Sequence, residues 1–104
     1  MKSQKLQLVT IISEVVLLEK LQADLTALGA TGLTVTEVRG EGSRQANAAV
    51  VPGDKIKIEC IVAAELATEI FDFVAREFFE HYSLIAYAAE VSVIRGDKFV
   101  PKKS

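Results

Sequence analysis

The sequence predicts an α+β fold in which two helices cover one face of a four-stranded antiparallel sheet, in the order βαββαβ. Two segments have apolar residues at the three-to-four-residue spacing of amphipathic helices, and the segments around them are short and rich in β-branched residues. This element order is the ferredoxin-like arrangement. At 104 residues, the chain is expected to be a single domain spanning residues 1–104.

The first third of the chain provides one strand and one helix. Residues 5–13 are mostly apolar, which predicts a central strand that is covered on both faces. Ser13 is a candidate N-cap for the helix that follows, with Glu14 at the positive end of the helix dipole. Leucines recur at helical spacing as far as Leu28, and Gly29 is placed to end the helix.

A long hairpin is predicted next. Residues 32–40 and 55–62 have strand patterns, and the loop 41–53 between them closes with a Pro-Gly turn. The second strand alternates between two faces, and the side chains expected in the core are Ile56, Ile58, Cys60 and Val62. Cys60 is the chain's one cysteine, so an internal disulfide is excluded and an inert core residue is expected.

The last third of the chain is predicted to form a helix and the last strand. Residues 63–82 carry an apolar stripe at helical spacing, residues 84–94 have a strand pattern, and residues 98–104 are expected to be a flexible tail. His81 is the only histidine and has no cysteine near it in sequence, so no metal site is predicted.

One face of the predicted sheet has no covering element in this chain. We expect that face to carry Val35, Ile61 and their neighbours. An uncovered apolar sheet face calls for a partner, and a closed trimer with its sheets facing inward would provide one.

Composition excludes several functions. The formal net charge of −2 gives no electrostatic basis for general nucleic-acid binding, and the predicted central strands lack the aromatic residues on which RNA-binding modules of this topology stack bases. The apolar run at residues 6–12 is too short for a membrane span or signal peptide, so a cytoplasmic location is expected. No carboxylate pair or nucleophile–base pair has a spacing that dictates catalysis, so no catalytic residue is predicted.

Three motifs carry a resemblance to a known family. They are GLTVTEVRGEG at residues 32–42 followed by Ser43-Arg44, KIKIE at residues 55–59, and EFFEHY at residues 77–82 leading into the last strand and Arg95-Gly96. In this order and spacing they resemble the PII-type signalling proteins, and more closely the PII-like branch tied to bicarbonate uptake and carboxysomes.

The resemblance implies a trimer that binds adenine nucleotides in the clefts between subunits. At the matched positions, the adenine edge would be held by Thr34, Val35, Glu59 and Ile61. The phosphates would meet the backbone amides of Gly40 and Gly42, together with Ser43, Arg44, Lys55 and, from a neighbouring subunit, Arg95. The loop 41–53 would correspond to the T-loop, which contacts a partner protein in this family.

The chain departs from the family pattern at three places. Tyr82-Ser83-Leu84 stands where PII proteins have a phosphate-binding loop rich in glycine and lysine, which favours ADP or AMP over ATP with magnesium. The loop 41–53 is short and has no tyrosine for nucleotidylylation, so 2-oxoglutarate binding is not expected. The tail lacks the cysteine pair of some bicarbonate-linked relatives, so that redox switch is absent.

The resulting hypothesis is a non-enzymatic sensor that binds ADP or AMP, with bicarbonate as a candidate second ligand. Its partner would be an inorganic-carbon transporter or a carboxysome-related protein. Two alternatives stay open at this point: a weak nucleotide-hydrolysing enzyme on the same fold, and a trimeric structural or metal-tolerance protein.

Overall fold

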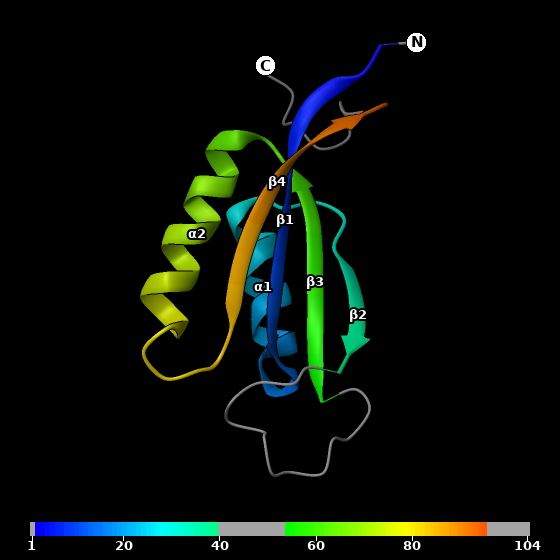
Figure 1. The fold of residues 1–104 in the computed structure, drawn as a ribbon. Helices are drawn as coiled ribbons and strands as arrows, with labels where there is room; N and C mark the ends of the chain where they lie inside the picture. The colour runs from blue at the N-terminus through cyan, green and yellow to red at the C-terminus, as the bar shows by residue number, and fades with distance from the viewer. Residues whose placement is uncertain (1, 40–53, 96–104) are drawn as a thin grey trace.

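The computed structural model describes residues 2–39 and 54–95, which form a four-stranded sheet with two helices (Figure 1). In chain order the elements are β1 (Gln4–Glu14), the 3₁₀ turn η1 (Val15–Leu17), α1 (Leu18–Leu28), β2 (Thr34–Val38), β3 (Lys55–Val62), α2 (Ala64–Phe78) and β4 (Ile85–Val93). The predicted loop 41–53 and tail 98–104 lie outside the described residues.

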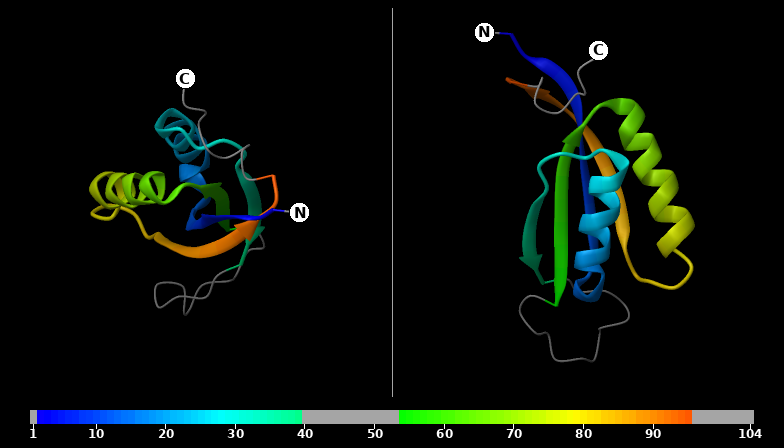
Figure 2. Two further views of the ribbon diagram at one scale, coloured as in Figure 1. Left: turned by 90° about the horizontal axis from the view of Figure 1, so that it is seen from above. Right: turned by 180° about the vertical axis from the view of Figure 1, so that it is seen from behind.

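The strands lie in the order β2-β3-β1-β4, and every neighbouring pair is antiparallel. Both helices lie on the same face of this sheet (Figure 2). The α+β, ferredoxin-like prediction is therefore confirmed, with β1 and β3 as the central strands.

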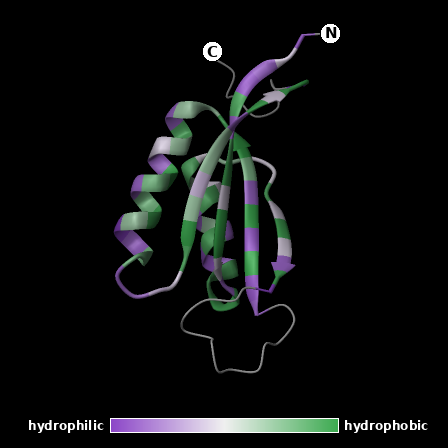
Figure 3. Ribbon diagram, in the orientation of Figure 1, coloured by the Kyte–Doolittle hydropathy of each residue, from purple (hydrophilic) through white to green (hydrophobic). Residues whose placement is uncertain are grey.

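The hydrophobic core lies between the helices and the face of the sheet that they cover. Buried and partly exposed residues alternate along β3, and Figure 3 shows hydrophobic and hydrophilic residues as bands along this strand. The buried residues include Ile56, Ile58, Cys60 and Val62 from β3, Leu21 and Leu25 from α1, and Ile70, Val74 and Phe78 from α2. Burial stabilises the fold by roughly 1.5–3 kcal/mol for each large apolar side chain.

The corner between β1 and α1 differs from the prediction. Ser13 does not cap a helix: it is a fully buried residue of β1 whose hydroxyl donates a hydrogen bond to the Glu14 carbonyl oxygen at 3.1 Å. Pairing of β1 with β3 continues through Glu14, so the helix begins later, at Leu18, after the η1 turn. Sheet pairing overrides the capping pattern because it satisfies the backbone groups of both strands.

The predicted end of α1 is confirmed. Gly29 has a φ of 117°, and its amide donates to the Thr26 carbonyl at 3.1 Å while the next amide, of Ala30, reaches the Leu25 carbonyl at 3.0 Å. Glycine adopts this left-handed conformation without the steric cost of a Cβ. The turn redirects the chain toward β2.

The other face of the sheet, called the open face here, has neither helix on it (Figure 2). β1 is therefore not covered on both faces within the described part of the chain, which corrects that prediction. The open face carries Leu8 and Ile12 from β1 and, from β4, Ile85 and Tyr87, which are 55% and 47% exposed.

Val35 does not lie on the open face, contrary to the prediction. Its Cα pairs with that of Ile58, which is buried, and its side chain packs against the core. Because side chains alternate along a strand, Thr34, Thr36 and Val38 are the β2 residues that share the open face with Glu59 and its neighbours. Ile61 does lie on the open face, opposite Leu8.

Candidate functional site

A pocket of about 240 Å³ lies where β2 enters the sheet beside β3. Its lining residues are Leu8, Gly32, Thr34, Glu59, Cys60 and Ile61. Thr34 stands directly opposite Glu59 across β2 and β3, and Ile61 stands opposite Leu8 across β3 and β1. The pocket thus brings together three of the predicted site residues, namely Thr34, Glu59 and Ile61.

Leu8 and Gly32 were not predicted as site residues. Leu8 belongs to a strand with apolar residues on both faces, so only the pairing register reveals that it faces the pocket. Gly32 opens the GLTVTEV motif and has a φ of 73°, a conformation that glycine adopts readily. Its place two residues before the β-branched strand β2 is the feature of the sequence that could have indicated Gly32.

Cys60 lines the pocket, but its side chain belongs to the hydrophobic core. Burial raises the pKa of its thiol to about 11. The thiol therefore stays protonated at neutral pH and is a poor nucleophile. The prediction of a buried core cysteine is confirmed.

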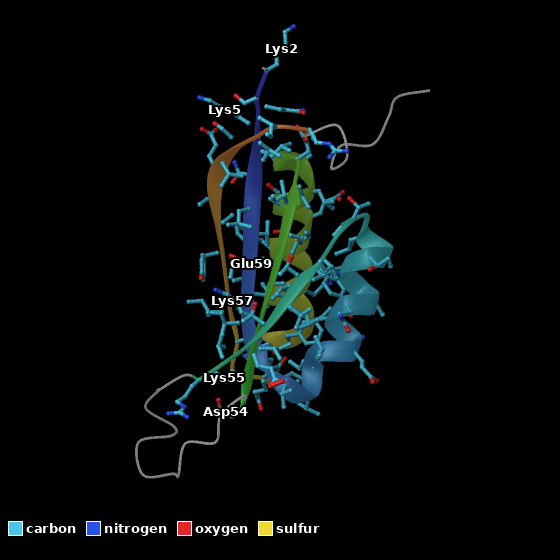
Figure 4. All side chains as sticks on the ribbon, turned by 90° about the vertical axis from the view of Figure 1, so that its right-hand side faces the viewer. Lys2, Lys5, Asp54, Lys55, Lys57 and Glu59 are labelled. Carbon is cyan, nitrogen blue, oxygen red and sulfur yellow. The ribbon has the colours of Figure 1, made fainter. Side chains whose placement is uncertain are left out.

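Lys55 lies on the same strand face as Glu59, with Lys57 between them (Figure 4). Lys55 and Glu59 are four positions apart, which corresponds to about 13 Å along an extended strand. One face of β3 therefore offers a carboxylate at the pocket and, farther along, two ammonium groups. This span is comparable with the length of an extended nucleoside diphosphate.

Arg95 is not brought close to Lys55 within one chain. β4 ends at Val93, which pairs with Gln4, whereas Lys55 pairs with Glu14 at the other end of β1. Arg95 follows β4 with a φ of 66° and is, among the residues described, the only non-glycine with a positive φ. Any site that uses both Lys55 and Arg95 must therefore draw them from different subunits.

The remaining predicted site residues, Gly40, Gly42, Ser43 and Arg44, lie outside the described residues. Their roles stay predictions. The described chain stops at Arg39 and resumes at Asp54, next to Lys55, so both ends of that segment leave the sheet at the end of β3 that carries Lys55.

The sequence profile of the family described as nitrogen regulatory protein P-II matches residues 6–98. The chain belongs to the P-II family. This P-II protein is therefore a regulatory signalling protein rather than an enzyme, and the nucleotide-hydrolysing alternative is set aside.

Individual relatives agree with this assignment. The protein is 33% identical over 79 residues to the nitrogen regulatory protein GlnK of Escherichia coli K12, an alignment that covers 68% of this chain and 70% of GlnK. Among solved structures, it is similar to a PII-like signalling protein of Thermus thermophilus, with a TM-score of 0.83, 40% identity, and coverage of 96% of this chain and all of that one.

A second solved relative is CPII of Thiomonas intermedia, whose structures contain ligands. The structure of CPII bound to ADP, AMP and acetate gives a TM-score of 0.84 at 26% identity and covers 97% of this P-II protein and all of that chain. Another structure, of CPII bound to ADP and bicarbonate, gives a TM-score of 0.80 at 26% identity, over 94% and 97% of the two chains.

Two further observations concern metal ligands and membrane-spanning helices. Across residues 2–39 and 54–95, no three histidine, cysteine, aspartate or glutamate side chains are placed to hold a metal ion. In the same two ranges, neither helix has the length and hydrophobicity needed to cross a membrane.

Proposed function

We propose that this P-II protein is a sensor of adenine nucleotides that binds ADP or AMP in clefts between the subunits of a trimer. Bicarbonate is the proposed second ligand, and the proposed output is control of inorganic-carbon uptake or carboxysome-related metabolism through residues 41–53. The observation that carries the proposal is the pocket at Thr34 and Glu59, which lies in line with Lys55 along one face of β3.

The pocket suits the base and sugar of a nucleotide. Leu8 and Ile61 offer apolar contact, and the hydroxyl of Thr34 can donate or accept a hydrogen bond. The Glu59 carboxylate accepts hydrogen bonds only, so it fits the ribose hydroxyls or the exocyclic amine of adenine and repels a phosphate. Val35 contributes through its main chain, because its side chain is in the core and β2 is an edge strand with unpaired backbone groups.

The phosphates would lie at the Lys55 end of β3. An ammonium group is a point charge that suits phosphate oxygens, and a forked guanidinium can bind two of them. We assign Lys55, the amides of Gly40 and Gly42, and the side chains of Ser43 and Arg44 to this end. Arg95 would arrive from a neighbouring subunit, since in its own chain it lies at the opposite end of the sheet.

The trimer is supported by the open face. Ile85 and Tyr87 are large apolar side chains that are about half exposed on it, and Leu8, Ile12 and Ile61 share the same face. Packing the open faces of several copies together would remove this apolar surface from water. The relatives support the ligands, because CPII structures contain ADP with AMP and ADP with bicarbonate.

Calorimetric titration with AMP, ADP and ATP, each with and without bicarbonate, tests this proposal. We expect saturable binding of ADP or AMP that bicarbonate tightens and that Lys55→Ala and Arg44→Ala weaken. Arg76→Ala is the charge-matched control, because Arg76 is exposed on α2 and pairs with Glu77. Absence of binding by every adenine nucleotide would refute the proposal.

A further inference from the structure

Glu14 and Lys55 occupy opposite positions at the end of the ladder between β1 and β3. Side chains at such positions lie within reach of each other, and opposite charges there attract. The structure shows no such pair: in the described residues no carboxylate lies within ion-pair distance of the Lys55 ammonium group. Among residues 2–39 and 54–95, Lys55 is therefore available for another anion.

The Glu14 carboxylate is held elsewhere. Its Oε2 accepts a hydrogen bond from the backbone amide of Ser83 at 2.9 Å, and Ser83 lies in the connection between α2 and β4. A carboxylate oxygen therefore occupies an N–H donor that would otherwise be free to bind an oxygen of a phosphate. The fixed negative charge of Glu14 remains at the same end of the sheet as Lys55.

We infer that Glu14 limits the negative charge of the nucleotide that the site accepts. This inference rests on the proposed function, in which Lys55 binds phosphate. Glu14 acts in two ways: it occupies the Ser83 amide as an internal anion, and its charge repels each phosphate group placed beside Lys55. Glu14 is thus a specificity-determining residue that disfavours ATP relative to ADP and AMP.

AMP, ADP and ATP differ in the number of phosphate charges, and comparing their affinities tests this inference. The affinities of the Glu14→Gln variant for AMP, ADP and ATP are measured without magnesium and compared with those of the unaltered protein. Glutamine keeps an oxygen that can accept from the Ser83 amide but removes the charge. We expect tighter binding of all three ligands, with the gain rising about twofold for each added phosphate charge, as expected for charges some 8 Å apart in a water-like medium.

Glu69→Gln is the matched control, because Glu69 is exposed on α2 and the substitution changes the net charge equally. A gain that rises with ligand charge in Glu14→Gln but not in Glu69→Gln supports the inference. An equal change for all three ligands, or no change, would overturn it, because a purely structural role of Glu14 does not depend on ligand charge.

Two measurements keep this outcome separate from failure of the proposed function. If Lys55→Ala leaves all three affinities unchanged, Lys55 is not a phosphate ligand, and the proposed site itself is wrong. If Lys55→Ala weakens binding, the site stands, and Glu14→Gln decides the inference. If Glu14→Gln does not fold, the unaltered protein still tests the inference. Binding of magnesium-free ATP more than about tenfold tighter than binding of ADP would contradict the proposed limit on ligand charge.

Discussion

Thr34 and Glu59 stand directly opposite each other across β2 and β3, and both line the pocket beside these strands. Neither residue is fully buried, so both can be reached by a ligand. A hydroxyl can donate or accept a hydrogen bond and a carboxylate only accepts, so in the proposed site this pair suits a sugar or a base rather than a phosphate.

Substitution of Glu59 should therefore affect nucleosides as strongly as nucleotides. We expect Glu59→Ala to weaken ADP binding about tenfold, corresponding to the loss of about 1.4 kcal/mol for a hydrogen bond to a charged group. Adenosine should lose affinity by the same factor, because Glu59 does not contact the phosphates in the proposed site. Titration calorimetry with both ligands measures this, and a loss confined to ADP would contradict the assignment.

Burial of the Cys60 thiol predicts how stability depends on pH. Burial raises the pKa of this thiol from 9.0 to about 11, so the unfolded chain releases the proton at lower pH than the folded chain does. The stabilising contribution is complete below pH 9 and is lost as the pH rises toward 11. In urea unfolding between pH 8 and pH 11, we expect Cys60→Ala to show a smaller loss of stability over this range than the unaltered protein. If the free energy of unfolding falls equally with pH in the two proteins, this prediction is wrong.

Arg95 combines a strained backbone with a proposed binding role, and two substitutions separate these effects. Its φ of 66° costs a non-glycine residue roughly 1 kcal/mol, which glycine avoids. We expect Arg95→Gly to be more stable than Arg95→Ala by about that amount in thermal unfolding. Both variants should bind ADP more weakly, because both lack the guanidinium. Equal ADP affinity in both variants and the unaltered protein would remove Arg95 from the site.

The sequence predicts some of these features better than others. The bounds of β3 and its buried face follow directly from the alternation over residues 55–62, since one register buries four apolar residues and leaves only Ile61 of the apolar positions on the other face. The sequence of β2 does not indicate its buried face in the same way, because Val35 and Val38 lie on opposite faces of an extended strand. The prediction that Val35 lies on the open face was therefore wrong.

Other features depend on contacts between distant segments. The hydrogen bond from the Ser83 amide to Glu14 joins residues 69 positions apart, and no local pattern indicates it. The capping signal at Ser13 was misleading for the same reason, because pairing with β3 extends β1 past that residue. The proposed role of Arg95 in the site needs a second copy of the chain, which a single sequence does not describe.

The open face provides the last prediction, which links assembly to ligand binding. Tyr87 is 47% exposed on β4, and a charge at this position would have to be desolvated if the open faces of several copies pack together. We expect Tyr87→Glu to shift the protein from trimer to monomer in sedimentation velocity. Phe79→Glu is the control, because Phe79 is 53% exposed but lies beyond the end of α2, away from the open face.

The Tyr87→Glu monomer should also lose ADP affinity, although Tyr87 does not line the pocket. The reason is that Arg95 lies at the opposite end of the sheet from Lys55 in its own chain, so a monomer cannot bring both to one phosphate group. Titration of the monomer with ADP measures the loss. A monomer that binds ADP as tightly as the unaltered protein would show that the site is complete within one chain, and Arg95 would then have no part in it.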